Sequence, residues 1–200
     1  MSAVRLISIA GVVGVGKTTL AKGLADILDG GLILEQYKEN PFLGDGTASA
    51  LACQLRFLLS RRRQLGREQL LSRASQQLGS RTFISDYVFE KDRIFAAMTL
   101  DERQYQVYQQ IASMIEQTIM PAGMVVFLQD TVEASLERIA RRDRPFERSI
   151  DACWLNRLND SYEELFRDWQ GCPVVRVDRS GLDLQDSSVI RKMGDLVCGP

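Results

Sequence analysis

The residues with the most specific chemistry form the segment GVVGVGKT, which runs from Gly11 to Thr18. In this GxxxxGK[ST] spacing, glycines let backbone N–H groups point at phosphate oxygens, and the following helix adds its positive N-terminal end. The lysine binds the β- and γ-phosphates of a nucleoside triphosphate, and the threonine hydroxyl coordinates Mg²⁺. We therefore predict a phosphate site made of Gly11, Val12, Val13, Gly14, Val15, Gly16, Lys17, Thr18 and Thr19.

This loop alone does not name a reaction, because switches and motors also contain it. A GTPase would carry an NKxD motif that reads guanine, and a transporter ATPase would carry an LSGGQ-like motif in a longer chain. Neither motif occurs in these 200 residues. The class that remains is mainly the small-molecule kinases.

Acidic residues follow three predicted strands, at the edge where ligands bind an open α/β sheet. Phosphoryl transfer to a hydroxyl needs one carboxylate near the acceptor oxygen and another that serves Mg²⁺. We assign Asp86 to Mg²⁺ and Glu35 to the general base, with a solvated loop acid as the alternative for Glu35. Asp130 resembles a Walker B acid only superficially, since Glu133 three residues on makes it a better N-cap of the next helix.

Gln54 and Arg61 lie seven residues apart in a long helical pattern, so they share one face of that helix. An amide can pair with a base edge through one donor and one acceptor, and a neighbouring arginine can donate to carbonyl or ring nitrogen acceptors. The pattern alone nevertheless favours a solvated charged stripe, because Arg61 opens a run of three arginines.

Short apolar runs alternate with helical patterns along the chain. We predict strands at residues 4–10, 32–34, 82–85, 124–128 and 173–177. We predict helices at 18–28, at 48–65, between Gly66 and Gly79, at 89–119 with a break near Thr99, from Asp130 to Ala140, at 150–169, and after Asp183. The alternation predicts an α/β P-loop NTPase fold, with a parallel sheet of about five strands flanked by helices on both faces, in one domain over residues 1–200.

The composition argues against several classes of protein. A net charge of −1 is unlike a protein that coats nucleic acid or an anionic membrane, and no run nears the roughly 18 apolar residues of a membrane span. The four cysteines form no CxxC pair and the chain has no histidine, which argues against a zinc site or a disulfide framework. We therefore expect a cytoplasmic protein with no nucleic-acid or membrane partner.

A series of segments follows in a characteristic order: ISIAGVVGVGKTTLAKGLA, Glu35, NPFL, Gln54, FLLSRRRQL, SDYVFEKDRIFA, MVVFLQ, RIARRDRPFE, WLNRLNDSYEELF and PVVRVD. Together they resemble the deoxynucleoside kinase family, which contains deoxycytidine, deoxyguanosine and deoxyadenosine kinases. The resemblance covers most of the chain. Apart from the phosphate loop, the order and spacing of the segments are more specific than any one of them.

The resemblance implies roles for individual residues on the acceptor side of the reaction. Glu35 would take the proton from the 5′-hydroxyl of the sugar, and Asp86 would lie near Mg²⁺ and the reacting phosphate. Gln54, Arg61 and Asp92 would face the nucleobase, which replaces the interpretation as a solvated stripe.

The resemblance also implies a lid at about residues 141–148 that folds over the phosphates. Its residues and their neighbour in the preceding helix are Arg138, Arg142, Arg144 and Glu147. Arg142 and Arg144, together with Lys17, would offset charge on the transferring group, and Glu147 would hold the 3′-hydroxyl.

Three departures from the family pattern accompany the resemblance. Tyr87 stands where the family has arginine, so one phosphate contact must be lost or come from elsewhere, with Arg93 as a candidate. The segment between Asn40 and Gln54 is a few residues short and lacks the tyrosine that usually helps Glu147 hold the sugar. Asp143 replaces the usual lid glycine.

The resemblance therefore implies ATP-dependent 5′-phosphorylation of a deoxynucleoside with Mg²⁺. Arg61 with Asp92 offers a donor and an acceptor to the base, which suits a purine or cytosine better than thymine. A homodimer through the apolar face of residues 94–119 is expected from the resemblance alone. Two alternatives stay open: a nucleoside monophosphate kinase resembling thymidylate kinase, which would need cations such as Lys38 near Glu35, and a nucleotide-binding regulator without catalysis.

Overall fold

The computed structural model describes residues 4–44, 49–76 and 81–198. The chain falls into two compact units: the first contains residues 1–34, 77–88 and 121–200, and the second contains residues 35–76 and 89–120. The predicted helix stop at Gly79 and residues 45–48 of the short segment lie outside the described residues. The expectation of one domain over residues 1–200 stays a prediction.

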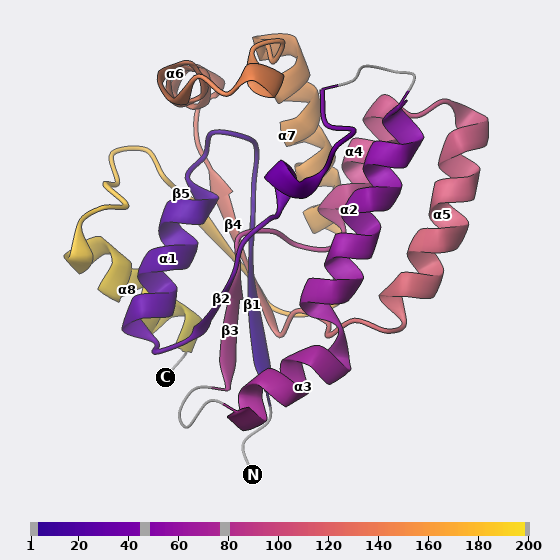
Figure 1. The fold of residues 1–200 in the computed structure, drawn as a ribbon. Helices are drawn as coiled ribbons and strands as arrows, with labels where there is room; N and C mark the ends of the chain where they lie inside the picture. The colour runs from indigo at the N-terminus through magenta and orange to yellow at the C-terminus, as the bar shows by residue number, and fades with distance from the viewer. Residues whose placement is uncertain (1–3, 45–48, 77–80, 199–200) are drawn as a thin grey trace. The chain divides into compact units, whose positions relative to one another are not determined.

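The first unit is built on a parallel sheet (Figure 1). Its described strands are β1 Arg5–Ala10, β2 Gly31–Ile33, β3 Thr82–Ser85, β4 Met124–Gln129 and β5 Val174–Asp178, in the spatial order β2-β3-β1-β4-β5. The central strand β1 pairs with two neighbours, so that Ile7 lies beside Ile84 on one side and Met124 on the other. Continuous apolar runs form these strands because a central parallel strand is buried on both faces.

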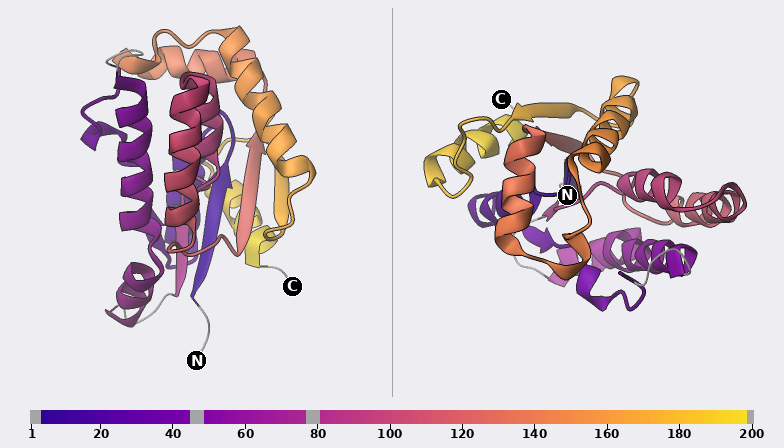
Figure 2. Two further views of the ribbon diagram at one scale, coloured as in Figure 1. Left: turned by 90° about the vertical axis from the view of Figure 1, so that its right-hand side faces the viewer. Right: turned by 90° about the horizontal axis from the view of Figure 1, so that it is seen from above.

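Helices cover both faces of this sheet, as predicted. The described helices of this unit are α1 Lys17–Ile27, α6 Val132–Arg142, the short 3-10 helix η3 Pro145–Glu147, α7 Ala152–Arg167 and α8 Ser187–Cys198. Figure 2 shows α1 and α8 on one side of the strands and α7 on the other. On the α7 side, the Phe127 ring of β4 lies 4.9 Å from Phe166 and 6.0 Å from Tyr162, centroid to centroid. None of the described helices is long and apolar enough to cross a membrane.

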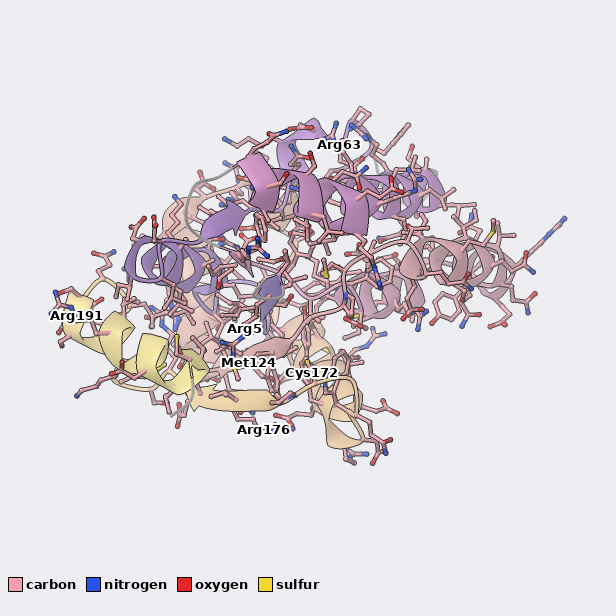
Figure 3. The ribbon with its side chains drawn as sticks, turned by 90° about the horizontal axis from the view of Figure 1, so that it is seen from below. Arg5, Arg63, Met124, Cys172, Arg176 and Arg191 are labelled. Carbon is pink, nitrogen blue, oxygen red and sulfur yellow. The ribbon has the colours of Figure 1, made fainter. Side chains whose placement is uncertain are left out.

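Arg5 connects the central strand to the end of the chain. Its Nη2 atom donates to the Val197 carbonyl of α8 and lies 3.8 Å from the Met124 sulfur of β4. Figure 3 shows Arg5 and Met124 side by side at this end of the strands. One arginine therefore joins the first strand, the fourth strand and the last helix of the first unit.

The second unit is helical. It contains the 3-10 helix η1 Tyr37–Glu39 and the helices α2 Ala50–Leu65, α3 Arg67–Gln76, α4 Lys91–Thr99 and α5 Glu102–Glu116. Helix α2 packs against both α4 and α5. The predicted break near Thr99 is confirmed, because Asp101 and Gln104 form a capping box that starts α5 as a new helix.

Candidate active site

The phosphate loop connects β1 to α1, as its sequence predicts. β1 ends at Ala10 and α1 begins at Lys17, whose Nζ atom lies 2.9 Å from the Gly11 carbonyl oxygen and 2.8 Å from that of Val12. The ammonium group is therefore folded back over the loop whose N–H groups would face phosphate oxygens.

Glycine is required in this loop for both backbone conformation and space. Gly14 has a φ of 86°, and a Cβ atom there would lie 2.5 Å from the carbonyl oxygen of Ser135 in α6. Any larger residue would strain the backbone and push the loop away from α6. The close approach sets the loop directly against the helix that carries Arg138.

Thr18 and Asp86 are brought together at the start of α1 and the end of β3. The Thr18 hydroxyl donates to Oδ2 of Asp86 at 2.6 Å, and Asp86 is nearly buried. A hydroxyl and a carboxylate are hard oxygen ligands, which suit Mg²⁺ because this ion keeps several waters and takes few protein ligands. These two residues therefore fit a magnesium ion bound together with phosphates.

The predicted capping role of Asp130 is wrong by one residue. Thr131 is the N-cap of α6, and its hydroxyl accepts from the Ala134 N–H at 3.1 Å. The Asp130 carboxylate instead accepts from both terminal nitrogens of Arg138, one of which also lies 3.4 Å from the Gly14 carbonyl oxygen. Asp130 thus orients an arginine beside the phosphate loop.

A cavity of about 290 Å³ lies next to this arginine in the first unit. Asp130, Glu137, Arg138, Arg141, Arg179 and Leu182 are among its lining residues. Arg179 follows β5 and donates to the Val15 carbonyl at 2.7 Å. Burial, and then the neighbouring Arg138, lower the pKa of Arg179. The sequence analysis missed this arginine, although its position two residues after a predicted strand was a usable signal.

The lid residues form a cluster of their own, the lid cluster Arg142, Arg144 and Glu147. Arg142 makes a bidentate pair with the Glu147 carboxylate at 2.6 and 2.7 Å, and Arg144 lies 3.3 Å from the same group. The Glu147 side chain is only 5% exposed. α6 extends two residues beyond the predicted end and stops at Asp143, which takes a left-handed conformation with a φ of 44°. Glycine is favoured in this conformation, so the position suits the family's usual residue.

The second unit holds the acceptor cluster, which we define as Glu35, Arg61, Lys91 and Asp92. Arg61 donates through Nε and Nη2 to the two Asp92 oxygens at 2.9 and 3.1 Å, and Nη2 also donates to Glu35. Lys91 donates to Glu35 at 2.8 Å. Glu35 is therefore no solvated loop acid, because two cations hold it.

The acceptor cluster keeps Glu35 ionised. Burial by itself raises the pKa of this carboxyl group, but the charges and hydrogen bonds of Lys91 and Arg61 outweigh burial. The pKa of Glu35 consequently lies well below its ordinary range.

The interpretation of α2 as a solvated charged stripe is wrong for Gln54 and Arg61. Arg61 is completely buried and Gln54 is 6% exposed, whereas the neighbouring Arg63 side chain is 56% exposed. Gln54 and Arg61 share an inward face, and the Gln54 amide nitrogen lies 3.3 Å from the Thr99 hydroxyl. The arginine run thus contains one buried residue and exposed neighbours, which a charge count cannot separate.

The family's arginine is absent at Tyr87, and the structure shows where Tyr87 and the candidate replacement Arg93 lie. Tyr87 is fully buried within the first unit. Arg93, the candidate replacement, pairs with Glu116 of α5 at 2.5 Å. Lys91, which the sequence analysis did not single out, contacts Glu35 together with Arg61. Its signal in the sequence was weak, because it stands as one lysine in a mixed-charge helix start.

The fold of the chain is shared with solved deoxyadenosine kinase structures. The enzyme from M. mycoides with bound dATP matches with a TM-score of 0.76 at 22% identity, over 98% of this chain and 100% of that one. The same enzyme with bound dCTP matches with a TM-score of 0.76 at 22% identity, over 97% of this chain and 99% of that one.

Curated relatives match across similar lengths. A deoxyadenosine kinase of Dictyostelium discoideum is 29% identical over 177 residues, which cover 87% of this chain and 72% of that protein. A deoxyguanosine kinase of Bacillus subtilis (strain 168) is 28% identical over 176 residues, which cover 85% and 82%. The family model described as deoxynucleoside kinase matches residues 7–196. Because this match spans nearly the whole chain, the protein belongs to the deoxynucleoside kinase family.

Proposed function

We propose that this protein transfers the γ-phosphoryl group of ATP to the 5′-hydroxyl of a deoxynucleoside, with a purine or cytosine base preferred. The observation that favours a nucleoside as the phosphoryl acceptor is that the charges of the acceptor cluster cancel. Glu35 and Asp92 contribute two negative charges, and Arg61 and Lys91 contribute two positive charges. A balanced cluster suits an uncharged nucleoside, whereas the phosphate of a nucleotide would need surplus cations.

The chain's own residues divide the chemistry of this reaction. Glu35 accepts the proton of the 5′-hydroxyl as the 5′-oxygen bonds to the γ-phosphorus. At the same time the bond between the γ-phosphorus and the β–γ bridging oxygen breaks, and ADP leaves. Lys17, Arg142 and Arg144 offset the charge that spreads over the transferring oxygens. Thr18 and Asp86 would hold Mg²⁺, which when bound shields the charge of the phosphates.

The Glu147 carboxylate is proposed to hold the 3′-hydroxyl of the sugar. It already accepts from Arg142 and Arg144. A carboxylate offers about four lone-pair positions, so it can accept from a hydroxyl group as well. The lid arginines would then keep Glu147 in the orientation that the sugar needs.

Gln54, Arg61 and Asp92 are proposed to read the nucleobase. The Arg61–Asp92 pair presents a guanidinium donor and a carboxylate acceptor on one rigid unit. The amino groups of adenine and cytosine can donate to the carboxylate, and the N7 and O6 atoms of guanine can accept from the guanidinium. The relatives named for deoxyadenosine and deoxyguanosine support the purine side of this preference.

The donor nucleobase is proposed to occupy the cavity beside the phosphate loop. Arg138 and Arg179 line this cavity and also contact the loop carbonyls of Gly14 and Val15. Guanidinium planes stack on nucleobases, so both residues suit an adenine. Their contacts with the loop would place the base next to the bound phosphates.

A transfer assay separates this proposal from the monophosphate kinase alternative. The unaltered protein receives labelled ATP, Mg²⁺ and each of eight nucleosides and deoxynucleosides, or their monophosphates. We expect transfer to deoxynucleosides only. Lys38, the cation that the alternative invokes, is exposed on η1 and has no place in the acceptor cluster. Transfer restricted to monophosphates would contradict the proposal.

The variant Glu35→Gln tests whether the chain is an enzyme or a nucleotide-binding regulator. We expect kcat to fall by about 10²- to 10⁴-fold because the proton acceptor is lost, with ATP affinity unchanged. Glu39→Gln is the matched control, since Glu39 pairs with Arg63 at the exposed surface. Equal activity of Glu35→Gln and the unaltered protein would refute the catalytic assignment.

A homodimer and a cytoplasmic location belong to the same proposal. Val107 and Met114 of α5 are 43% and 71% exposed and lie seven residues apart, on one helix face. All four cysteines are described and no disulfide joins them, which suits a reducing compartment. A mass of one chain in solution, measured by light scattering, would contradict the dimer.

A further inference from the structure

Lys91 lies at an unusual place for a lysine. It is the first residue of α4, only 7% exposed, and its Nζ atom lies 2.7 Å from Oε1 and 2.8 Å from Oε2 of Glu35. The ammonium group also lies 5.1 Å from the centre of the Phe95 ring, one turn further along the helix. Burying an ammonium group is costly unless it is paired, so this placement depends on Glu35.

Lys91 and Arg61 hold Glu35 in different ways. Arg61 is shared between two carboxylates, because Asp92 takes its Nε and Nη2 atoms and Glu35 accepts from Nη2 as well. Within the described part of the chain, Lys91 forms ion pairs with Glu35 only, and it reaches both oxygens of that carboxylate. Lys91 therefore fixes the orientation of the Glu35 carboxylate through both of its oxygens, whereas the Arg61 hydrogen bond reaches one of them.

We propose that Lys91 is a positioning residue for phosphoryl transfer: it holds the Glu35 carboxylate ionised and oriented, so that the reaction tolerates acidic conditions. This inference rests on the proposed role of Glu35 as proton acceptor. A carboxylate held by two cations is a weak base, so the proton leaves the hydroxyl late, which agrees with a loose, dissociative transition state. Orientation and ionisation are then what the base must provide, rather than basicity.

The groups that face Glu35 decide what the loss of Lys91 would do. Arg61 approaches from α2 and Lys91 from α4, while Asp92 of α4 acts against ionisation by drawing on the same Arg61. Without Lys91, the burial that raises the pKa of Glu35 loses one of the two cations that oppose it, and the shared Arg61 stays. The pKa of Glu35 then rises toward the range in which the base becomes protonated during the assay.

The test is the pH profile of kcat/KM for the preferred deoxynucleoside, measured from pH 5 to 9 wherever circular dichroism shows a folded protein. The unaltered protein should stay active down to about pH 5. Lys91→Met should move the acid midpoint up by at least about one pH unit, which is a tenfold loss or more on the acid side. Lys91→Arg should recover most of the profile, and Lys192→Met, a change of an exposed lysine on α8, should leave it unchanged.

A double-mutant cycle separates positioning from simple structural support. If Lys91 acts through Glu35, Lys91→Met should reduce kcat less than about twofold further in a Glu35→Gln background, because the group it positions is gone. Losses that multiply in the double variant would overturn the inference. An acid midpoint above about pH 6 in the unaltered protein would also overturn it, and this measurement stands even if Lys91→Met fails to fold.

The outcomes also distinguish this inference from the proposed function. If the unaltered protein transfers phosphate to no deoxynucleoside, the proposed function fails. If it does transfer phosphate, and the profiles of Lys91→Met and the unaltered protein coincide, the role of Lys91 alone is refuted.

Discussion

At the scale of single residues, Glu90 is the second carboxyl group with a strongly altered pKa. Burial, opposed by a hydrogen bond to its own backbone and reinforced by Glu116 and Asp92, raises the pKa of Glu90 from 4.5 to about 7. Between these two values the folded chain holds a proton that the unfolded chain has released. The free energy of unfolding therefore falls as the pH rises from about 4.5 to 7, and levels off above.

The variant Glu90→Gln removes this proton uptake. We expect it to be more stable than the unaltered protein at pH 8, by on the order of 1–3 kcal/mol, with the gain vanishing near pH 5. Urea unfolding at the two pH values measures the difference. Glu68→Gln, at an exposed position on α3, is the matched control. A Glu90→Gln gain that is equal at both pH values would contradict the explanation.

Residue-level prediction from the sequence was strongest where a motif or the end of a strand marks the residue. The phosphate loop and the Asp86–Thr18 contact follow from motif and strand ends. Lys91 was missed because its contact with Glu35 joins residues 56 positions apart, which no spacing rule reports. The burial of Arg61 was equally hidden, because an ion pair with Asp92 makes an inward arginine possible.

At the scale of elements, helix α6 begins at the N-cap Thr131, one residue after the cap predicted from the sequence. Thr131 is exposed and its hydroxyl accepts from the Ala134 N–H. We expect Thr131→Ala to lower the free energy of unfolding by about 1 kcal/mol, and Thr131→Ser to have little effect, because serine keeps the acceptor. Chemical denaturation measures both variants. Equal losses from alanine and serine would show that the hydroxyl is not what stabilises this end of α6.

Strands were easier to predict than helix ends, for a physical reason. A buried parallel strand is a continuous apolar run, so all five predicted strands overlap the observed ones, and Thr82–Ser85 matches fully. Helix ends depend on which of several polar side chains turns inward. Asp130 and Thr131 both fit a cap, and in the structure Thr131 accepts from the Ala134 N–H while Asp130 accepts from Arg138.

At the scale of the whole molecule, the chemistry is divided between the two units. The phosphate loop, Asp86 and the lid cluster belong to the first unit, and the acceptor cluster with Gln54 belongs to the second. The sequence did not reveal this division, because each unit is assembled from separate stretches of the chain. Local patterns describe elements, whereas the membership of a unit depends on long-range packing.

Hydrogen exchange measured by mass spectrometry tests this division. ATP alone should slow exchange in peptides that cover residues 11–19 and 138–147, and the preferred deoxynucleoside alone should slow it in peptides that cover 50–65 and 91–99. Saturation at 100 times Kd can slow opening by up to about 100-fold, because binding adds about 2.7 kcal/mol. Adenosine monophosphate and free ribose are controls. Protection by the deoxynucleoside confined to residues 11–19 would refute the assignment.

The Arg5 contact has a consequence for how the chain folds during synthesis. β1 is the first of the five strands to leave the ribosome, yet it lies in the centre of the sheet, and its partners β3 and β4 emerge about 75 and 120 residues later. Two contacts of this region form later than β3 and β4 emerge: the Val197 carbonyl that Arg5 binds, and the Ile190 side chain that lies against Gly23 of α1. The phosphate loop is therefore translated early but anchored late, and the nascent chain must keep β1 from pairing prematurely until α8 has been made.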